Sequence, residues 1–536
     1  MLENLPVLSL IIWIPLLGSL VVLFLPGYNA RAVRGAAIFF AVVPLLLALW
    51  LYASYEPIVG GQAFAEQGTW LSVPLNAEAF GLHANVASYR LAFDYRLGVD
   101  GISLPLVLLT GVVAAMASLA SVHIRKRWKT YFTLFLLLQT GMYGVFLARD
   151  VTLFFIFFEL TLVPMFFLIG IWGYFGREKA ANRFLVYNGL GSAVMLLAFL
   201  ILIATLGFSS AETSGGTELI FSGSYDTMLA NLKDPNAAAH QNSAMFLSEN
   251  LKWAAFVLLL VAFGIKLPMF PFHTWMLKVH TEAPPAVVMI HSGILLKMGA
   301  YGLIRFAAFL LPVQLHASST VLAIIGVVNI LYGAVLACVQ KEFKLVLAYS
   351  SVSQMGIVLL GIASLNETGF EGAIYQAVSH GLISALLFLL VGSLHERTGT
   401  TRIDELGGLA QTVPFLSGIL LTAGLASLGL PGLSGFVGEF LSFLGLFSSM
   451  KALTAVGVIG VLLAAVYVLR SVLAITNGPL PERFAGLKDA RFVEALPMVV
   501  LTALIVLLGI YPSLLTDLMQ HGFDGLLKEL QTRVGG

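Results

Sequence analysis

The chain has 536 residues, of which 59% are hydrophobic and only 11% are charged, and its formal net charge is +1. A mean hydropathy of +0.93 excludes a large soluble domain with a polar exterior, so most of the chain must lie in lipid. The single cysteine, Cys338, excludes an internal disulfide and an iron–sulfur cluster held by this chain alone. It lies in an apolar run, and we interpret it as a small apolar filler.

Windows of about 20 apolar residues predict fourteen membrane-spanning helices and therefore an all-α polytopic membrane protein. In chain order the predicted spans cover residues 7–26, 32–53, 101–121, 130–148, 151–172, 184–207, 253–276, 283–310, 317–339, 345–364, 371–394, 413–447, 453–476 and 492–512. The first run lacks a basic leader and an Ala-x-Ala cleavage site, so we expect it to be a retained helix. The two long outer connections, residues 54–100 and 208–252, are expected to be partly ordered caps.

The distribution of lysine and arginine predicts how the chain is oriented in the membrane. With fourteen spans, seventeen of these residues fall in the connections of one side, and eight fall in the connections and tail of the other side. The positive-inside rule then places both termini outside. Arg305 and Arg470 lie near the ends of spans, so we expect them to snorkel to the interface, whereas Lys266 and Lys297 are too deep to do so.

Four ionisable side chains lie in the interior of apolar spans: Glu159, Lys266, Lys297 and Glu439. A charge at mid-membrane costs about 2.5 to 3.5 kcal/mol on insertion scales, so such groups persist mainly where they pair or line a hydrated path. At about 1.5 Å per residue, Glu159 lies roughly 12 Å into its span and the two lysines lie roughly 20 Å into theirs. This series predicts a protein that moves charge, along the membrane plane as well as across it.

Two of the predicted spans contain helix breakers beside these charges. Lys266 is followed by Pro268 and Pro271, and Glu439 follows a glycine-rich segment that contains Pro431. Proline removes a backbone donor, and freed backbone groups in lipid are tolerated only where protein or water meets them. Broken helices in corresponding halves of a transporter are typical of an ion site. Alternatively, these prolines only kink packed helices.

The breaks fall in spans seven and twelve, five spans apart, which predicts two five-helix repeats of inverted orientation. The expected division is 1–121 for the first three helices with an outer loop, 122–312 for the first repeat, 313–476 for the second repeat, and 477–536 for the last helix and the tail.

Four stretches of sequence are similar to the proton-translocating, antiporter-like subunits of respiratory complex I, and most specifically to the subunit M or chain 4 type. They are LGVDGISLPLVLLT from Leu97, KLPMFPFHTWMLKVHTEAPPAVVMIHSGILLKMGAYGLIRF from Lys266, KLVLAYSSVSQMG from Lys344 and LPGLSGFVGEF from Leu430. With the number of spans, the resemblance extends over essentially the whole chain. In one departure, many relatives read L-P-D-A-H where this chain has Met276 to His280, which concerns an inner connection and not the mid-membrane residues.

The resemblance implies a translocation path through Glu159, Lys266, Lys297 and Glu439, with His291 and His380 as relay groups. Glu159 would pair with Lys266 and tune the protonation of that lysine, and Lys297 would connect the path to Glu439, the terminal acid. A glutamate at position 439 resembles subunit M, because the L- and N-like relatives usually have lysine there.

The same resemblance implies the partners and the location. This chain would hold no cofactor, and NADH, FMN, iron–sulfur clusters and quinone would be bound by partner subunits. The partners would be the L-, N-, K-, J-, A- and H-like membrane-arm subunits and the peripheral redox arm, in the inner (plasma) membrane of the cell and without nucleic acid. Proton translocation would be coupled to quinone reduction elsewhere in the complex, so the activity is that of an NADH:quinone oxidoreductase.

Other interpretations stay open at this point. The chain could be an Mrp-like cation/proton antiporter subunit without coupling to electron transfer, or an inert scaffold of a membrane complex. Glu159 and Lys266 could form a static ion pair, because buried pairs often hold helices together. A lone membrane histidine is as often a packing residue as a proton carrier, and we expect His273 and Lys344 to be structural or interfacial.

Overall fold

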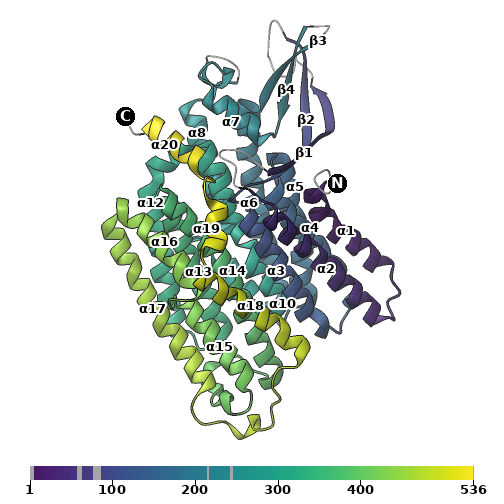
Figure 1. The fold of residues 1–536 in the computed structure, drawn as a ribbon, viewed down its shortest axis with the longest axis vertical. Helices are drawn as coiled ribbons and strands as arrows, with labels where there is room; N and C mark the ends of the chain where they lie inside the picture. Colours follow the sequence, from purple (N-terminus) through teal and green to yellow (C-terminus); the bar gives the residue numbers. More distant parts are fainter. Residues whose placement is uncertain (1–4, 57–62, 76–85, 214–215, 242–244, 535–536) are drawn as a thin grey trace.

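The computed structural model describes residues 5–56, 63–75, 86–213, 216–241 and 245–534. Within these residues twelve helices are long and apolar enough to cross a membrane, which confirms the predicted helical membrane fold. They are α1 (Val7–Phe24), α2 (Ala30–Ala53), α3 (Leu104–Ala120, extended to His123), α4 (Trp128–Leu147), α5 (Val151–Trp172), α6 (Arg177–Leu206), a composite helix (Pro285–Ala308), α12 (Pro312–Val339), α13 (Phe343–Ala363), α14 (Glu367–Thr398), α17 (Lys451–Thr476) and α18 (Phe492–Ile510). Figure 1 shows these helices packed side by side as one bundle.

Two further helices are interrupted where the sequence predicts a break. They are the pair α8 (Glu249–Lys266) and α9 (Thr274–Glu282) and the pair α15 (Pro414–Ser427) and α16 (Ser434–Ser449). Lys266 is the last residue of α8, and Glu439 lies near the start of α16. Both charges therefore lie at helix breaks, as predicted. The total of fourteen spans and the inverted repeats stay predictions.

The composite helix carries Lys297 between two irregular turns. Its segments are α10 (Pro285–Ile290), a π-helical turn (His291–Leu295), α11 (Lys297–Gly302) and a second π-helical turn (Leu303–Ala308). Single π-turns inside α-helices are frequent at functional sites. The most apolar stretches of the composite helix and of its neighbour α14 are buried completely. Polar side chains on these two helices therefore face protein and not lipid.

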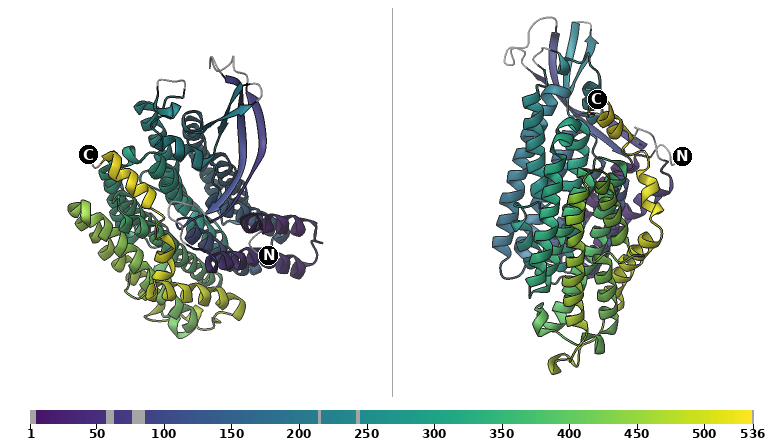
Figure 2. Two further views of the ribbon diagram at one scale, coloured as in Figure 1. Left: turned by 45° about the horizontal axis from the view of Figure 1, so that its top comes forward. Right: turned by 90° about the vertical axis from the view of Figure 1, so that its left-hand side faces the viewer.

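The two long outer connections form one β-sheet, which a purely helical prediction omits. Its strands are β1 (Ala63–Leu75), β2 (Val86–Val99), β3 (Phe208–Thr213) and β4 (Gly216–Ser222), in the order β1-β2-β4-β3. The inner pair β2 and β4 is parallel and joins the first outer connection to the second. Figure 2 shows the sheet projecting from one end of the bundle. Residues 57–62, 76–85, 214–215 and 242–244 of the predicted caps lie outside the described residues.

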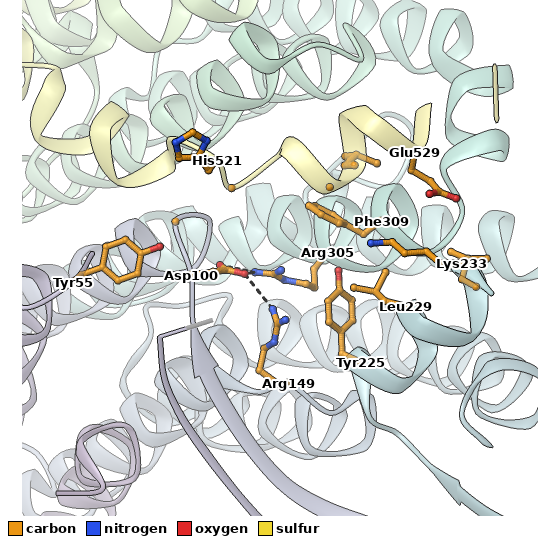
Figure 3. Close-up of a pocket in the computed structure, with 15 residues that line it drawn as sticks. Tyr55, Asp100, Arg149, Tyr225, Leu229, Lys233, Arg305, Phe309, His521 and Glu529 are labelled. Carbon is orange, nitrogen blue, oxygen red and sulfur yellow. Dashed lines mark hydrogen bonds and ion pairs between the residues drawn. The ribbon is translucent and has the colours of Figure 1, made fainter. Parts of the chain in front are cut away.

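A buried ion cluster joins the base of the sheet to the bundle. Asp100, just after β2, accepts hydrogen bonds from Arg305 at 2.7 Å and from Arg149 at 3.1 Å. Figure 3 shows the carboxylate facing the guanidinium groups of both arginines, beneath the C-terminal segment that carries α19 (Ser513–Met519) and α20 (Asp524–Val534). The snorkelling predicted for Arg305 is therefore wrong, because the side chain is only 3% exposed and is held by the half-buried carboxylate of Asp100.

Candidate functional site

Lys297 is completely buried and contacts groups on two helices. Its ammonium donates to the carbonyl of Ser292, which lies in the first π-helical turn, and lies 2.9 Å from Nδ1 of His380 on α14. The π-turn offers this carbonyl because its backbone hydrogen bonds follow a wider spacing than those of an α-helix. The structure therefore places two predicted site residues, Lys297 and His380, in direct contact.

His291 contacts a histidine that the sequence interpretation did not assign to the path. Nε2 of His280, on α9, lies 2.9 Å from Nδ1 of His291, and both rings are fully buried. His291 is also near enough to Lys266 and Lys297 for the charge of each lysine to act on it. Its ring therefore lies within electrostatic reach of both lysines, with His280 as a neighbouring proton acceptor or donor. The sequence interpretation placed His280 in an inner connection, so it was not considered as a mid-membrane group.

Lys266 and Glu159 are near neighbours, but their implied ion pair is not closed in this structure. The Lys266 ammonium lies 4.7 Å from the centroid of the Phe158 ring and 5.7 Å from that of Phe184. Neither this ammonium nor the buried Oε1 of Glu159 has a hydrogen-bond partner among the described residues. The charge of Glu159 is still close enough to act on Lys266.

Protein groups compensate the broken backbone beside Lys266. Asn329 on α12 accepts a hydrogen bond from the backbone N–H of Phe270 at 2.8 Å, and its amide nitrogen lies 3.4 Å from the carbonyl of Pro268. The indole N–H of Trp275 donates to the carbonyl of Ile265 at 3.1 Å. The break is thus held open by partners from α9 and α12, which agrees with the rule that irregular backbone in a membrane must be met by protein or water.

Glu439 is held by a pair of glutamines that the sequence interpretation also missed. The side-chain amide of Gln354 on α13 donates to Glu439 Oε1 at 3.0 Å and lies 3.3 Å from the carbonyl of Ser427, at the break between α15 and α16. Gln376 on α14 donates in turn to the Gln354 oxygen. All three side chains are at most 5% exposed. Glutamines inside apolar spans were the signal that could have identified this network.

One helix connects the lysine and the terminal glutamate. Gln376 and His380 are four residues apart on α14, so they lie on one face with a rise of about 6 Å between them. Gln376 contacts the network around Glu439, and His380 contacts Lys297. A hydrogen bond of 2.7 Å between Ser379 and Ser434 also joins α14 to the start of α16. The six predicted site residues thus form a series of neighbouring groups through the interior of the bundle.

Two other sequence candidates lie beside this series. His273 is 2% exposed and packs against the ring of Tyr332 at a centroid distance of 5.0 Å. Lys344 is 8% exposed, and its ammonium lies 3.8 Å from the centroid of the Tyr174 ring. Among the described residues, no group of three or more His, Cys, Asp or Glu side chains is placed to hold a metal ion. The series is made of groups that accept, donate or orient protons.

The fold and this site define an antiporter-like polytopic membrane protein. Residues 148–464 match the family described as NADH:quinone oxidoreductase/Mrp antiporter, TM. The chain is 35% identical to NADH-quinone oxidoreductase subunit M of Rhodobacter capsulatus, with 98% of both chains covered. It is also 35% identical to NAD(P)H-quinone oxidoreductase chain 4 of Prochlorococcus marinus, with 98% of this chain and 93% of the relative covered. The chain therefore belongs to the NADH:quinone oxidoreductase/Mrp antiporter family of transmembrane subunits, as its sequence motifs predict.

Two solved structures have the same fold. A chain of respiratory complex I from Thermus thermophilus with bound NADH superposes with a TM-score of 0.80 at 29% identity and covers 97% of this chain and 99% of that one. A chain of the Mrp complex from Dietzia sp. DQ12-45-1b superposes with a TM-score of 0.77 at 21% identity and covers 99% of this chain and 97% of that one. At this identity the match shows the fold alone.

Proposed function

We propose that this chain is the subunit M of an NADH:quinone oxidoreductase and translocates protons through the membrane arm. The names and full-length coverage of the relatives support the assignment to subunit M. Protons would move along Glu159, Lys266, Lys297 and Glu439, with His291 and His380 as relays and with His280, Gln354 and Gln376 added by their contacts. Quinone reduction in other subunits would drive the movement.

The contact between Lys297 and His380 is the observation that carries this proposal. These two residues lie in helices whose most apolar stretches are fully buried, so their polar groups contact neither lipid nor solvent. A buried lysine that is held by one carbonyl and one imidazole can pass a proton to that imidazole without moving its helix. Buried ionisable groups in a membrane mark such pathways.

The arrangement of the complex around the chain follows from the same assignment. The L-, N-, K-, J-, A- and H-like subunits and a peripheral redox arm would be the partners, and NADH, FMN, iron–sulfur clusters and quinone would be bound by those partners. The chain would lie in the plasma membrane with both termini outside. Its units would be 1–121, 122–312, 313–476 and 477–536, and the two middle units would be the inverted repeats.

The experiment is a lysine replacement in the assembled complex. Lys266→Met removes the titratable group at the first break, and Lys252→Met is the matched control, because it changes a lysine at the opposite, outer end of the same α8. We expect Lys266→Met to lower the proton-to-electron ratio of inside-out vesicles, measured with a pH-sensitive dye during NADH oxidation, and Lys252→Met to leave it unchanged. An unaltered ratio in assembled Lys266→Met complex would refute the pathway.

A cation/proton antiporter subunit is the second candidate, supported by the common fold with the Mrp complex chain. The proteins that co-purify with this chain decide between the two functions. Co-purification with quinone-site and iron–sulfur subunits supports the first, whereas co-purification with other antiporter subunits only would assign the second.

A further inference from the structure

A cleft of about 650 Å³, lined by charged and hydroxyl side chains among apolar ones, opens at the end of the bundle where the α5–α6 connection, α9 and the start of α13 meet. This end carries the connections that are rich in lysine and arginine and is the predicted inner face. Tyr174 and Lys344 line it in contact with each other, and Thr274 and Lys278 line it from α9. None of these residues belongs to the proposed translocation path.

The cleft has more positive charge than its own acids can balance. Arg183, Lys278 and Lys344 line it, and among the described residues none of these three has a carboxylate within 4.0 Å. The two acids of the cleft, Glu282 and Glu342, act on Lys344 and also accept hydrogen bonds from other donors, so the three cations leave the cleft with a net positive charge. Glu282 accepts from the backbone N–H of Gly176 at 2.8 Å, and Glu342 accepts from the hydroxyl of Thr401. The cleft thus suits an anionic group.

An exposed apolar stripe on α6 begins at the cleft. Val186, Leu190 and Leu197 are 66%, 60% and 54% exposed. Their spacing from Arg183, by three, seven and fourteen residues, places all four side chains on one face of the helix. At the rim of the cleft, the side chain of Phe175 is fully exposed. A cationic group at the head of an apolar helix face matches the two parts of a phospholipid, a phosphate and an acyl chain.

We propose that this cleft binds an anionic phospholipid of the inner leaflet. Its phosphate lies between Arg183 and Lys278, and one acyl chain follows the stripe formed by Val186, Leu190 and Leu197. The inner leaflet supplies such lipids, and basic pockets between helices on this side of a membrane are suited to their headgroups. Because Lys278 and His280 are two residues apart on α9, they point to different sides of the helix. A lipid bound to Lys278 therefore also restrains α9 on the side opposite His280.

The test uses the assembled complex in vesicles of phosphatidylcholine with phosphatidylglycerol that carries a photoreactive acyl chain. After illumination, the labelled peptides are mapped by mass spectrometry. We expect labelling of the segment 183–200, and labelling from photoreactive phosphatidylcholine lower by on the order of tenfold. The double variant Arg183→Gln with Lys278→Gln should reduce the labelling by phosphatidylglycerol to the phosphatidylcholine level. Lys179→Gln, an exposed lysine of the same helix outside the cleft, should not change it.

Three results would overturn the proposal. They are equal labelling by both lipids in the wild-type complex, labelling that is abolished by millimolar inorganic phosphate, and labelling by phosphatidylglycerol that is confined to segments other than 183–200. The comparison of the two lipids uses the wild-type complex, so it tests the preference for an anionic headgroup even if the double variant fails to assemble. The result is independent of proton translocation, which is measured separately.

Discussion

Asp100→Asn should destabilise the junction between the outer sheet and the bundle. Burial alone would raise the pKa of Asp100, but the charges of Arg305 and Arg149 outweigh burial and lower that pKa from 3.8 to about 2. This lowered pKa corresponds to stabilisation on the order of 2 kcal/mol at neutral pH. Arg149 keeps Asp226 at 2.9 Å, whereas Arg305 has no second carboxylate within 4.0 Å among the described residues. Because the buried Arg305 loses its partner, we expect a cost of about 3 kcal/mol.

The thiol of Cys338 gives the assay. This half-buried cysteine lies on α12, and its modification by a maleimide during heating, measured on the Cys338 peptide, reports unfolding of this chain inside the complex. We expect the midpoint temperature of labelling to fall by several degrees in Asp100→Asn. Asp404→Asn is the matched control, because its pair with Arg402 is solvent-exposed and contributes little. Equal midpoints for the two variants would refute the reasoning.

The pKa of Asp100 also predicts a pH dependence, and three further variants test the site. Since this pKa is depressed, the stabilisation is present above about pH 4 and is lost as the pH falls toward 2. The wild-type labelling midpoint should therefore approach that of Asp100→Asn in acid, measured with a dithiodipyridine in place of the maleimide, because a maleimide needs the thiolate. Asn329→Ala leaves the N–H of Phe270 unpaired and should lower the same midpoint, at a cost of about 1 to 3 kcal/mol. Gln354→Leu removes a donor from the Glu439 carboxylate and should lower proton translocation per electron, less than Glu439→Gln does; an equal or larger loss would contradict an orienting role. His280→Phe should slow translocation by on the order of tenfold and His280→Gln by less, measured in the same vesicles; equal rates for both variants would contradict proton exchange with His291.

The sequence was sufficient to predict the helical membrane fold and the two broken helices. Long apolar runs identify spans because every backbone polar group in lipid must be satisfied within the segment. Pro268 and Pro271 mark one break, and the glycines before Glu439 mark the other, because these residues disturb a helix wherever it packs. The buried positions of Lys266, Lys297 and Glu439 follow from the same pattern.

Contacts between distant segments could not be predicted in the same way. Tyr89, Leu91, Phe93 and Tyr95 alternate with other residues in β2, which is typical of a strand, but nothing in this alternation identifies β4 as its partner. The glutamines around Glu439 were overlooked because the prediction considered ionisable residues and not neutral amides. Arg305 was misplaced because its partner, Asp100, lies 205 residues earlier in the chain.

The parallel pairing of β2 with β4 has a consequence for the order of synthesis. When β1 and β2 have been made, β2 has one neighbour, and its other edge stays open until the ribosome has made four more helices and residues 216–222. An open strand edge is a template for pairing with the wrong chain. During synthesis of this chain there is therefore an interval in which the β1–β2 hairpin has an unpaired edge, because its partner strand lies more than a hundred residues downstream.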